Sequence, residues 1–144
     1  MHIAIRRLDP DLPLPESQHP DDAGYDLVAR VDATIAPGGG RVMIPTGIAV
    51  AIPAGFAGFV QPRSGLALRS GITVLNTPGL VDAGYRDELR VILVNLDPVE
   101  EFTVKRGDRI AQLVIQKVEL VEWRVVDDLD ATDRGLGGFG STGV

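Results

Sequence analysis

Short runs of β-branched and other apolar residues, each cut off by glycine or proline, are the feature that most restricts the fold of this chain. The runs cover residues 2–8, 41–52, 56–61, 88–96 and 109–126. Glycine or proline interrupts them at residues 37–40, 53–55, 78–79 and 107. Apolar residues hardly ever recur at helical spacing, so the pattern predicts an all-β fold, either a sandwich or a barrel.

One short helix is expected at residues 64–70, where Leu66, Ala67 and Leu68 are good helix formers. With 144 residues, no internal repeat and no linker, the chain fits a single domain with a real core, built mainly from Val, Ile, Leu and Ala. We place this domain at residues 1–129. The segment 130–144 has almost no apolar residues, so we expect it to be mobile until something holds it.

Charge and composition exclude several functions. A net charge of −6 argues against broad nucleic-acid binding, which needs a basic face, but not against a small anionic ligand. No apolar run approaches the roughly 18 residues of a membrane span, and the first residues do not form an apolar signal segment. The chain also lacks cysteine, so we expect a soluble, cytoplasmic protein without disulfides or thiolate metal sites.

Arginine dominates the basic residues, with twelve arginines against two lysines. Genome composition could produce this bias. Arg63, Arg69, Arg86 and Arg134 nevertheless all lie in glycine-rich segments. The planar guanidinium group suits phosphate oxygens, so an anionic ligand is a second explanation.

Residues 76–90 carry the strongest chemical signal. This stretch places a carboxylate, Asp82, at a tight turn, with the ring of Tyr85 three residues later. Gly79 and Gly84 flank the pair and let the backbone approach a ligand closely. A plain hairpin requires neither an exposed acid nor a ring, so the stretch indicates a ligand-binding turn.

Two further segments can be interpreted either as ordinary structure or as part of an anion site. Ser64 is expected to cap the helix, and the same geometry, with Arg63 beside it, would bind an anion. Acids around Gly24 usually mean a solvated turn, whereas Asp26 could hold a water of a magnesium ion carried by a triphosphate. The two histidines do not have the spacing of a metal site.

The tail also has two interpretations. Gly135, Gly137 and Gly140 satisfy the spacing of a dinucleotide-binding fingerprint, but the strand and helix which that fingerprint needs are not expected around them. Composition alone allows a polar, disordered tail. Arg134 and Phe139, set among glycines and hydroxyls, could instead clamp a phosphate and a base.

Taken together, five segments resemble, in order and with similar spacing, the five motifs of the trimeric dUTPases, which hydrolyse deoxyuridine triphosphate. The segments are residues 22–29, 62–72, 76–91, 106–114 and 134–143. The resemblance covers most of the chain. It implies a jelly-roll-like β-barrel that forms a homotrimer, with active sites combining residues from all three subunits, and residues 130–144 closing as a lid over a neighbour's site.

The implied reaction is hydrolysis of dUTP to dUMP and pyrophosphate, which limits uracil in DNA and supplies dUMP for dTTP synthesis. Asp82 resembles the carboxylate that activates water for attack on the α-phosphorus, and without a usable histidine it is the available base. Tyr85 resembles the ring beneath the deoxyribose that rejects a ribose 2′-hydroxyl. Asn76, with the main chain near Gly79 and Val81, resembles the hairpin that reads uracil.

The phosphate side of the site would come from other segments. Ser64 and Gly65 resemble contacts to the phosphate chain, and Arg63 resembles a supporting charge. The implied cofactor is Mg²⁺, held mainly by the triphosphate, without a direct protein ligand and through water to Asp26 and Gln112.

The tail would complete the site. Arg134 resembles the ligand of the γ-phosphate, and Phe139 resembles the lid ring over uracil. Further substrate contacts are expected from Gly140, Ser141 and Thr142. The resemblance thus makes Asp82, Ser64 and Arg134 the predicted catalytic residues.

One departure from the family pattern and two alternatives stay open. Asp87 stands where many family members have glycine, and this second acid could shift the hairpin or slow an approaching anion. A dCTP deaminase of the same superfamily shares the Arg-Ser motif but needs a glutamate base beside the pyrimidine. A catalytically silent nucleotide sensor is disfavoured by the presence of Asp82, Tyr85 and both motif arginines.

Overall fold

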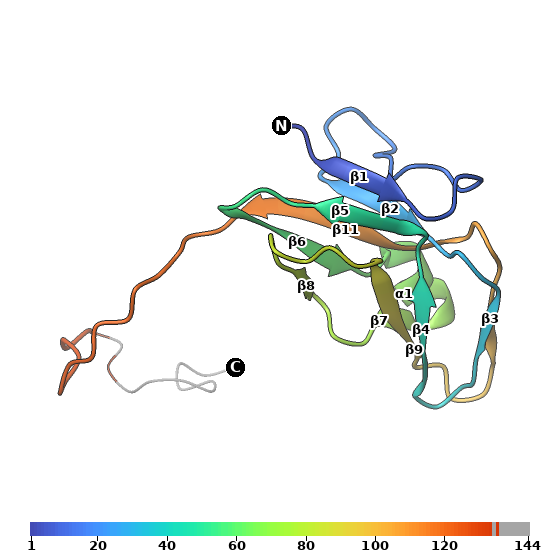
Figure 1. Cartoon of the computed structure of the whole chain (residues 1–144). Helices are drawn as coiled ribbons and strands as arrows, with labels where there is room; N and C mark the ends of the chain where they lie inside the picture. Colours follow the sequence, from blue (N-terminus) through green and yellow to red (C-terminus); the bar gives the residue numbers. More distant parts are fainter. Residues whose placement is uncertain (134, 136–144) are drawn as a thin grey trace.

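The computed structural model describes residues 1–133 and 135, and this part of the chain is almost entirely β. Figure 1 shows its elements. In chain order they are β1 (Ala4–Arg7), β2 (Gly24–Val28), β3 (Ala33–Ile35), β4 (Gly40–Pro45), β5 (Ile48–Ala51), β6 (Phe56–Gln61), α1 (Ser64–Ser70), β7 (Ile72–Val74), β8 (Gly79–Val81), β9 (Arg90–Asn95), β10 (Phe102–Val104) and β11 (Arg109–Lys117).

The strands pair in an antiparallel manner into four sheets. The largest has the order β2–β11–β6–β8, and the next has the order β4–β9–β7. The pairs β1–β5 and β3–β10 complete the set. The all-β class with one short helix is confirmed. Within the described residues the pairing does not close into a ring, so the jelly-roll barrel stays a prediction.

The core between the sheets is built from Val, Ile, Leu and Ala, as composition predicts. Every sheet contributes to it. The largest apolar side chains with almost no solvent exposure are Leu27, Ile35, Ile44, Ile52, Ile72, Leu93 and Ile110. Burial of one such side chain contributes about 1.5–3 kcal/mol, so the core supplies a rigid frame for the loops.

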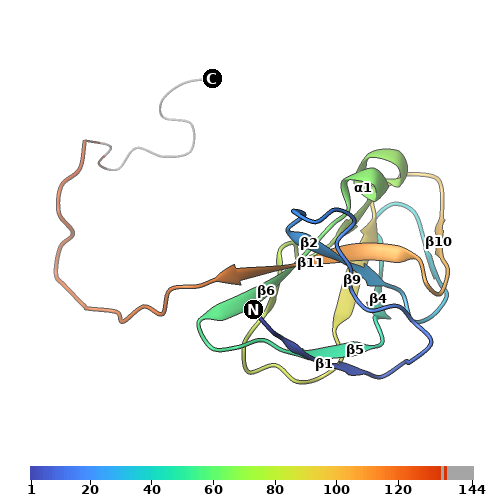
Figure 2. The ribbon, with the colours of Figure 1, turned by 90° about the horizontal axis from the view of Figure 1, so that it is seen from above.

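Two predicted elements have the bounds that the sequence indicated, and others are shorter. Strand β6 covers residues 56–61 and α1 covers residues 64–70. Residues 2–8 and 88–96 shorten to β1 and β9. The predicted strand at residues 109–126 ends at Lys117, and the chain beyond it runs away from the sheets (Figures 1 and 2).

The predicted strand at residues 41–52 is wrong in one respect, because the chain turns at Thr46 and Gly47 to give β4 and β5. Gly47 has a φ of 78°, a conformation that favours glycine. A Cβ atom at this position would also lie 3.0 Å from the Cβ of Asp9. The turn therefore depends on glycine.

Five strands were not predicted. Four of them, β3, β7, β8 and β10, have three residues each, which is too short to show a period of two. The fifth, β2, overturns the solvated turn predicted around Gly24, because Leu27 and Val28 are buried there. No helix among the described residues has the length and apolar character needed to cross a membrane.

Candidate active site

Three side chains from distant segments lie side by side across the large sheet. Asp26 of β2 is opposite Gln112 of β11, and Gln112 is opposite Gln61 of β6. Residues in register on neighbouring strands project from the same face of a sheet, so these polar groups form one row. The row lines a cavity of about 470 Å³.

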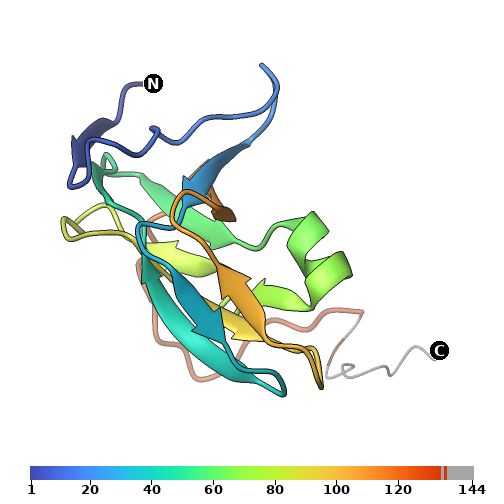
Figure 3. The same ribbon diagram turned by 90° about the vertical axis from the view of Figure 1, so that its right-hand side faces the viewer.

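The start of α1 forms another wall of this cavity. Pro62 and Arg63 connect β6 to α1, which brings Arg63, Ser64 and Gly65 to the cavity. Figure 3 shows the helix directly after the end of that strand. The structure thus places Ser64 and Gly65 on the same cavity as Asp26 and Gln112. We call this the polar cavity.

Asp26 is the carboxylate of the polar cavity to which the neighbouring basic and amide groups bind. Its Oδ1 lies 3.1 Å from Nε of Arg63, and its Oδ2 lies 3.1 Å from Nη1 of Arg109. Gln18 also donates a hydrogen bond to Oδ2, at 3.0 Å. The Asp26 side chain is only 13% exposed, so two partly exposed arginines and an amide hold it in place.

Gln112 is oriented from two sides. Its Nε2 donates a hydrogen bond to the carbonyl oxygen of Pro62 at 2.9 Å. Its Oε1 lies over Gly24, where a Cβ atom would approach it to 2.3 Å. Any larger residue at position 24 would displace this amide, so the Gly24 of the first motif has a structural explanation.

The residues of the polar cavity suit an ion that arrives with its own ligands. Mg²⁺ prefers oxygen ligands and keeps several waters, and Asp26 and Gln112 offer a carboxylate and an amide. Among the described residues no three His, Cys, Asp or Glu side chains gather into a metal site. The oxygen atoms of Asp26 and Gln112 therefore suit the waters of such an ion, and the magnesium site itself stays a prediction.

Asp82 and Tyr85 lie on a second cavity, of about 280 Å³, together with Val81 and Arg90. The backbone N–H of Tyr85 donates to the carbonyl oxygen of Asp82 at 3.0 Å, which closes the tight turn. The Tyr85 hydroxyl donates to the carbonyl oxygen of Glu88 at 2.9 Å, which orients the ring. The exposed acid and the ring therefore share one site. We call it the hairpin cavity.

The Glu88 side chain connects this hairpin to the neighbouring part of the fold. It is one of the few charged side chains in the protein interior, with 8% exposure. Its Oε1 accepts a hydrogen bond from the backbone N–H of Gly47 at 2.8 Å and lies 3.4 Å from Nη1 of Arg30. These contacts join the hairpin to the β4–β5 turn.

The remaining hairpin residues lie outside both cavities. Asn76 is exposed to solvent. Gly79 is buried and lies opposite Val60, and a Cβ atom on Gly79 would be 3.2 Å from Nδ2 of Asn76. Asp87 bonds within the hairpin, because its Oδ1 accepts from the Glu88 N–H at 2.7 Å and its Oδ2 lies 3.5 Å from Nη2 of Arg90. Its charge is therefore partly offset locally.

One prediction about this region is wrong. Ser64 is not the N-cap of α1, because Arg63 occupies that position with extended backbone and no side chain caps the helix. Ser64 is the first helical residue and lines the polar cavity. The predicted tail residues lie outside the described part of the chain: Arg134, Phe139, Gly140, Ser141 and Thr142.

Several residues at the two cavities were not predicted as site residues. Gln18, Arg69 and Arg109 belong to the polar cavity or to its Asp26 network, and Arg90 lines the hairpin cavity. Arg109 belongs to the fourth motif, so its segment gave a signal. Arg69 also gave one, because it is among the arginines of glycine-rich segments for which an anionic ligand was one explanation. Gln18 lies in a proline-rich loop and gave none.

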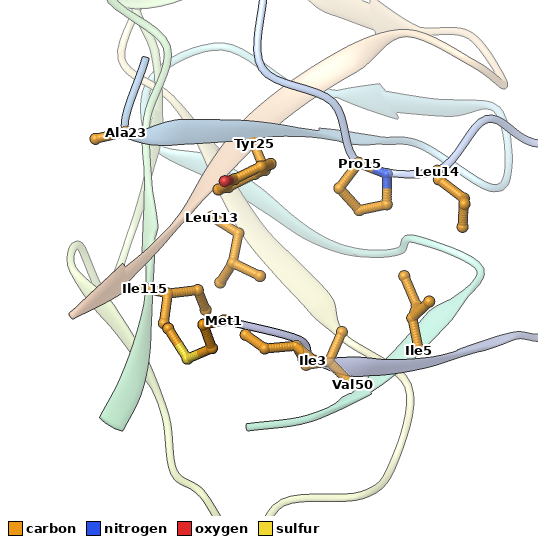
Figure 4. A pocket seen from close by; sticks show the side chains of 10 residues that line it. All are labelled: Met1, Ile3, Ile5, Leu14, Pro15, Ala23, Tyr25, Val50, Leu113 and Ile115. Atoms are coloured by element: carbon orange, nitrogen blue, oxygen red, sulfur yellow. The ribbon is translucent and has the colours of Figure 1, made fainter. Parts of the chain in front are cut away.

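A third cavity, of about 560 Å³, has an apolar lining and contains no predicted site residue. Figure 4 shows Ile3, Ile5, Val50 and Leu113 pointing into it, with Tyr25 at one side. The segment after β11 also carries exposed apolar side chains, including Val121, Trp123 and Val125. We call the third cavity the apolar cavity.

The comparisons with known proteins agree with one another. The model of the dUTPase family matches residues 11–143. The deoxyuridine 5′-triphosphate nucleotidohydrolase of Rhodococcus erythropolis is 56% identical over 143 residues, covering 99% of this chain and 87% of the relative. The protein of the same name from Corynebacterium glutamicum is 57% identical over 141 residues, covering 98% and 94%.

Solved structures give the same result. The dUTPase of Staphylococcus bacteriophage 80alpha, solved with dUpNHpp, has a TM-score of 0.91 at 28% identity, covering 99% of each chain. A mutant dUTPase of phage phi11 of S. aureus, with a structural Mg(II) ion, has a TM-score of 0.83 at 25% identity, covering 91% of this chain and 100% of that chain. Because the family model spans most of the sequence and these relatives are more than 50% identical to it over nearly its whole length, the chain belongs to the dUTPase family.

Proposed function

We propose that this protein hydrolyses dUTP to dUMP and pyrophosphate. The observation that carries the proposal is the placement of Asp82 and Tyr85 on one cavity of a dUTPase-family chain. The polar cavity supports it, since arginine, serine and amide groups gather there as a triphosphate requires.

Asp82 is the base in this reaction. Its carboxylate takes a proton from a water molecule, whose oxygen forms a bond to the α-phosphorus. The bond between the α-phosphorus and the bridging oxygen breaks, and that oxygen leaves with pyrophosphate. The exposed turn supports this role, because it leaves the carboxylate open to a water and a substrate.

Tyr85 and the hairpin select the nucleoside. The hydrogen bond from the Tyr85 hydroxyl to the Glu88 carbonyl fixes the ring, so a fixed surface would meet the sugar and leave no room for a 2′-hydroxyl. Asn76, with the main chain near Gly79 and Val81, would read uracil. A tight hairpin would exclude the 5-methyl group of thymine.

The polar cavity binds the triphosphate. Ser64 and Gly65 would contact phosphate oxygens, and Arg63 would add charge to them. A bound magnesium ion supplies neutralisation of the phosphate charge, and Asp26 and Gln112 would hold its waters. Arg134 and Phe139 of the tail would close over the γ-phosphate and the base, with Gly140, Ser141 and Thr142 adding contacts.

The positions of the two cavities support shared sites in a homotrimer. Their linings have no residue in common. Val60 lines the hairpin cavity and the adjacent Gln61 lines the polar cavity, and neighbours on a strand point to opposite faces of a sheet. This supports Asp82 of one subunit acting on a triphosphate held by another.

The apolar surfaces support the same assembly. The apolar cavity and the exposed segment with Val121, Trp123 and Val125 both need cover, and contacts between copies of this chain would supply it. Residues 130–144 as a lid and the cytoplasm as the location stay predictions.

The base is tested with Asp82→Asn in the full-length protein. We expect this variant to bind dUpNHpp like the wild type, because an amide keeps the shape of the turn, and to release no pyrophosphate from dUTP. Wild-type turnover in Asp82→Asn would remove the residue from its role.

Shared sites are tested by mixing Asp82→Asn with a variant that lacks residues 133–144. Neither protein alone should hydrolyse dUTP at an appreciable rate. Subunit exchange should restore activity, because some sites then combine an intact base with an intact tail. No recovery between proteins shown to exchange subunits would contradict shared sites.

A further inference from the structure

Arg69 lies on the polar cavity but has no role in the function set out above. It belongs to the last turn of α1 and is exposed to solvent. Its Nη2 and Nη1 atoms would be 2.9 Å and 3.1 Å from a Cβ atom on Gly65. The guanidinium group therefore covers the Gly65 backbone at the wall of the cavity.

The neighbouring arginines are already engaged. Arg63 pairs with Asp26 and donates to the carbonyl oxygen of Arg109 at 3.2 Å, and Arg109 pairs with the same carboxylate. Within residues 1–133 and 135, no ion pair joins Arg69 to a carboxylate. Arg69 thus presents a positive charge that the described residues leave for a ligand.

We propose that Arg69 is a further substrate-binding residue, whose guanidinium group binds the β- and γ-phosphates of dUTP. The inference rests on the proposed function. The α-phosphorus must lie next to the water that Asp82 activates, so the outer phosphates extend into the polar cavity, where Arg69 lies. Two parallel N–H donors match two phosphate oxygens, and the outer phosphates carry most of the charge.

Gly65 has a second role in this arrangement. A methyl group at position 65 would meet the flexible end of the Arg69 side chain and push the guanidinium group away. Gly65 therefore leaves the space that Arg69 needs over the phosphate contacts. The two residues should be energetically coupled in binding a triphosphate.

Calorimetric titration of the full-length protein with dUMP and with dUpNHpp, both with Mg²⁺, tests the proposal. Arg69→Gln should raise the Kd of dUpNHpp roughly 10- to 100-fold, the range of a charge-assisted hydrogen bond, and that of dUMP by less than about 3-fold. Arg69→Lys, which keeps the charge without the fork, should lie between. Arg41→Gln is the control, because Arg41 is exposed on β4 and lines neither the polar nor the hairpin cavity.

Coupling gives a second measurement. Gly65→Ala should weaken dUpNHpp binding more in the wild-type background than in the Arg69→Gln background. The reason is that the Arg69→Gln protein has no guanidinium group for the added methyl group to displace. The proposal is overturned if Arg69→Gln binds dUpNHpp within about 2-fold of the wild type, or if dUMP and dUpNHpp lose affinity equally, as a packing role would produce. Failure of the wild type to bind dUpNHpp at all would instead overturn the proposed function.

Discussion

Removal of the Glu88 carboxylate should both destabilise the fold and loosen the hairpin that carries Asp82 and Tyr85. In Glu88→Ala the buried N–H of Gly47 loses its acceptor, which costs about 1–3 kcal/mol. The ion pair with Arg30 adds less than about 1 kcal/mol, because the arginine side chain is 37% exposed and solvent screens the pair. We expect a total loss of roughly 1–4 kcal/mol in the free energy of unfolding.

Two matched variants separate the contributions. Glu88→Gln keeps an oxygen that accepts from Gly47 and loses only the charge, so it should cost about 1 kcal/mol. Asp87→Ala removes the neighbouring carboxylate, which is 66% exposed, and its hydrogen bond from the Glu88 N–H, and should cost about 0.5–1 kcal/mol. The Tyr85 hydroxyl donates to the backbone carbonyl of residue 88, which Glu88→Ala keeps. Because the variant loses the side-chain contact with Gly47 that holds this backbone in place, it should also reduce the preference for dUTP over UTP.

The assay is equilibrium unfolding in urea at one fixed protein concentration, because subunit association would make stability depend on concentration. The same samples are then used for steady-state hydrolysis of dUTP and UTP. The reasoning is refuted if Glu88→Ala is as stable as Asp87→Ala, since the buried carboxylate would then hold nothing.

Further perturbations test other parts of the structure. Gly24→Ala should leave the unfolding transition nearly unchanged but lower dUTP turnover, measured by pyrophosphate release, because the added Cβ would displace Oε1 of Gln112. Normal turnover in this variant would contradict the need for the observed orientation of the Gln112 amide. Asp26→Asn should raise the Mg²⁺ concentration needed for half-maximal activity, and an unchanged metal titration would remove Asp26 from this role. Backbone N–H groups of Glu100 and Val99 donate to the Asp97 carboxylate and lower its pKa. The folded state therefore binds a proton at Asp97 less readily than the unfolded state does. The stability that Asp97 contributes should be lost as the pH falls below 3.8, the ordinary pKa of the group. Urea unfolding between pH 5 and pH 2 should therefore show a smaller loss in Asp97→Asn, and an identical pH profile would contradict this contribution.

Regular and strongly punctuated parts of the fold could be predicted from the sequence. Strand β6 and helix α1 lie between Gly55 and Gly71, and proline at position 62 separates them, so both had clear limits. Strands of three residues have no such signal. For example, β3 and β10 exist because they pair with each other across 60 or more residues of chain, and only the tertiary fold creates that pairing.

The site shows the same division. The residue types of the polar cavity follow from the motifs, and Asp26, Ser64 and Gln112 all lie there. Their row across β2, β11 and β6 depends on strand register, which no single segment encodes. The ion pairs of Asp26 with Arg63 and Arg109 depend likewise on side chains that meet only in the folded protein.

The most direct test of the account measures dUMP, pyrophosphate and ammonia after incubation of the full-length protein with dUTP, dCTP, dTTP or UTP in the presence of Mg²⁺. We predict that dUTP alone is converted, to equal amounts of dUMP and pyrophosphate, with no ammonia from any substrate. Ammonia from dCTP would show a deaminase instead. An absence of pyrophosphate release from dUTP would contradict the assignment of Asp82 and the polar cavity to this reaction.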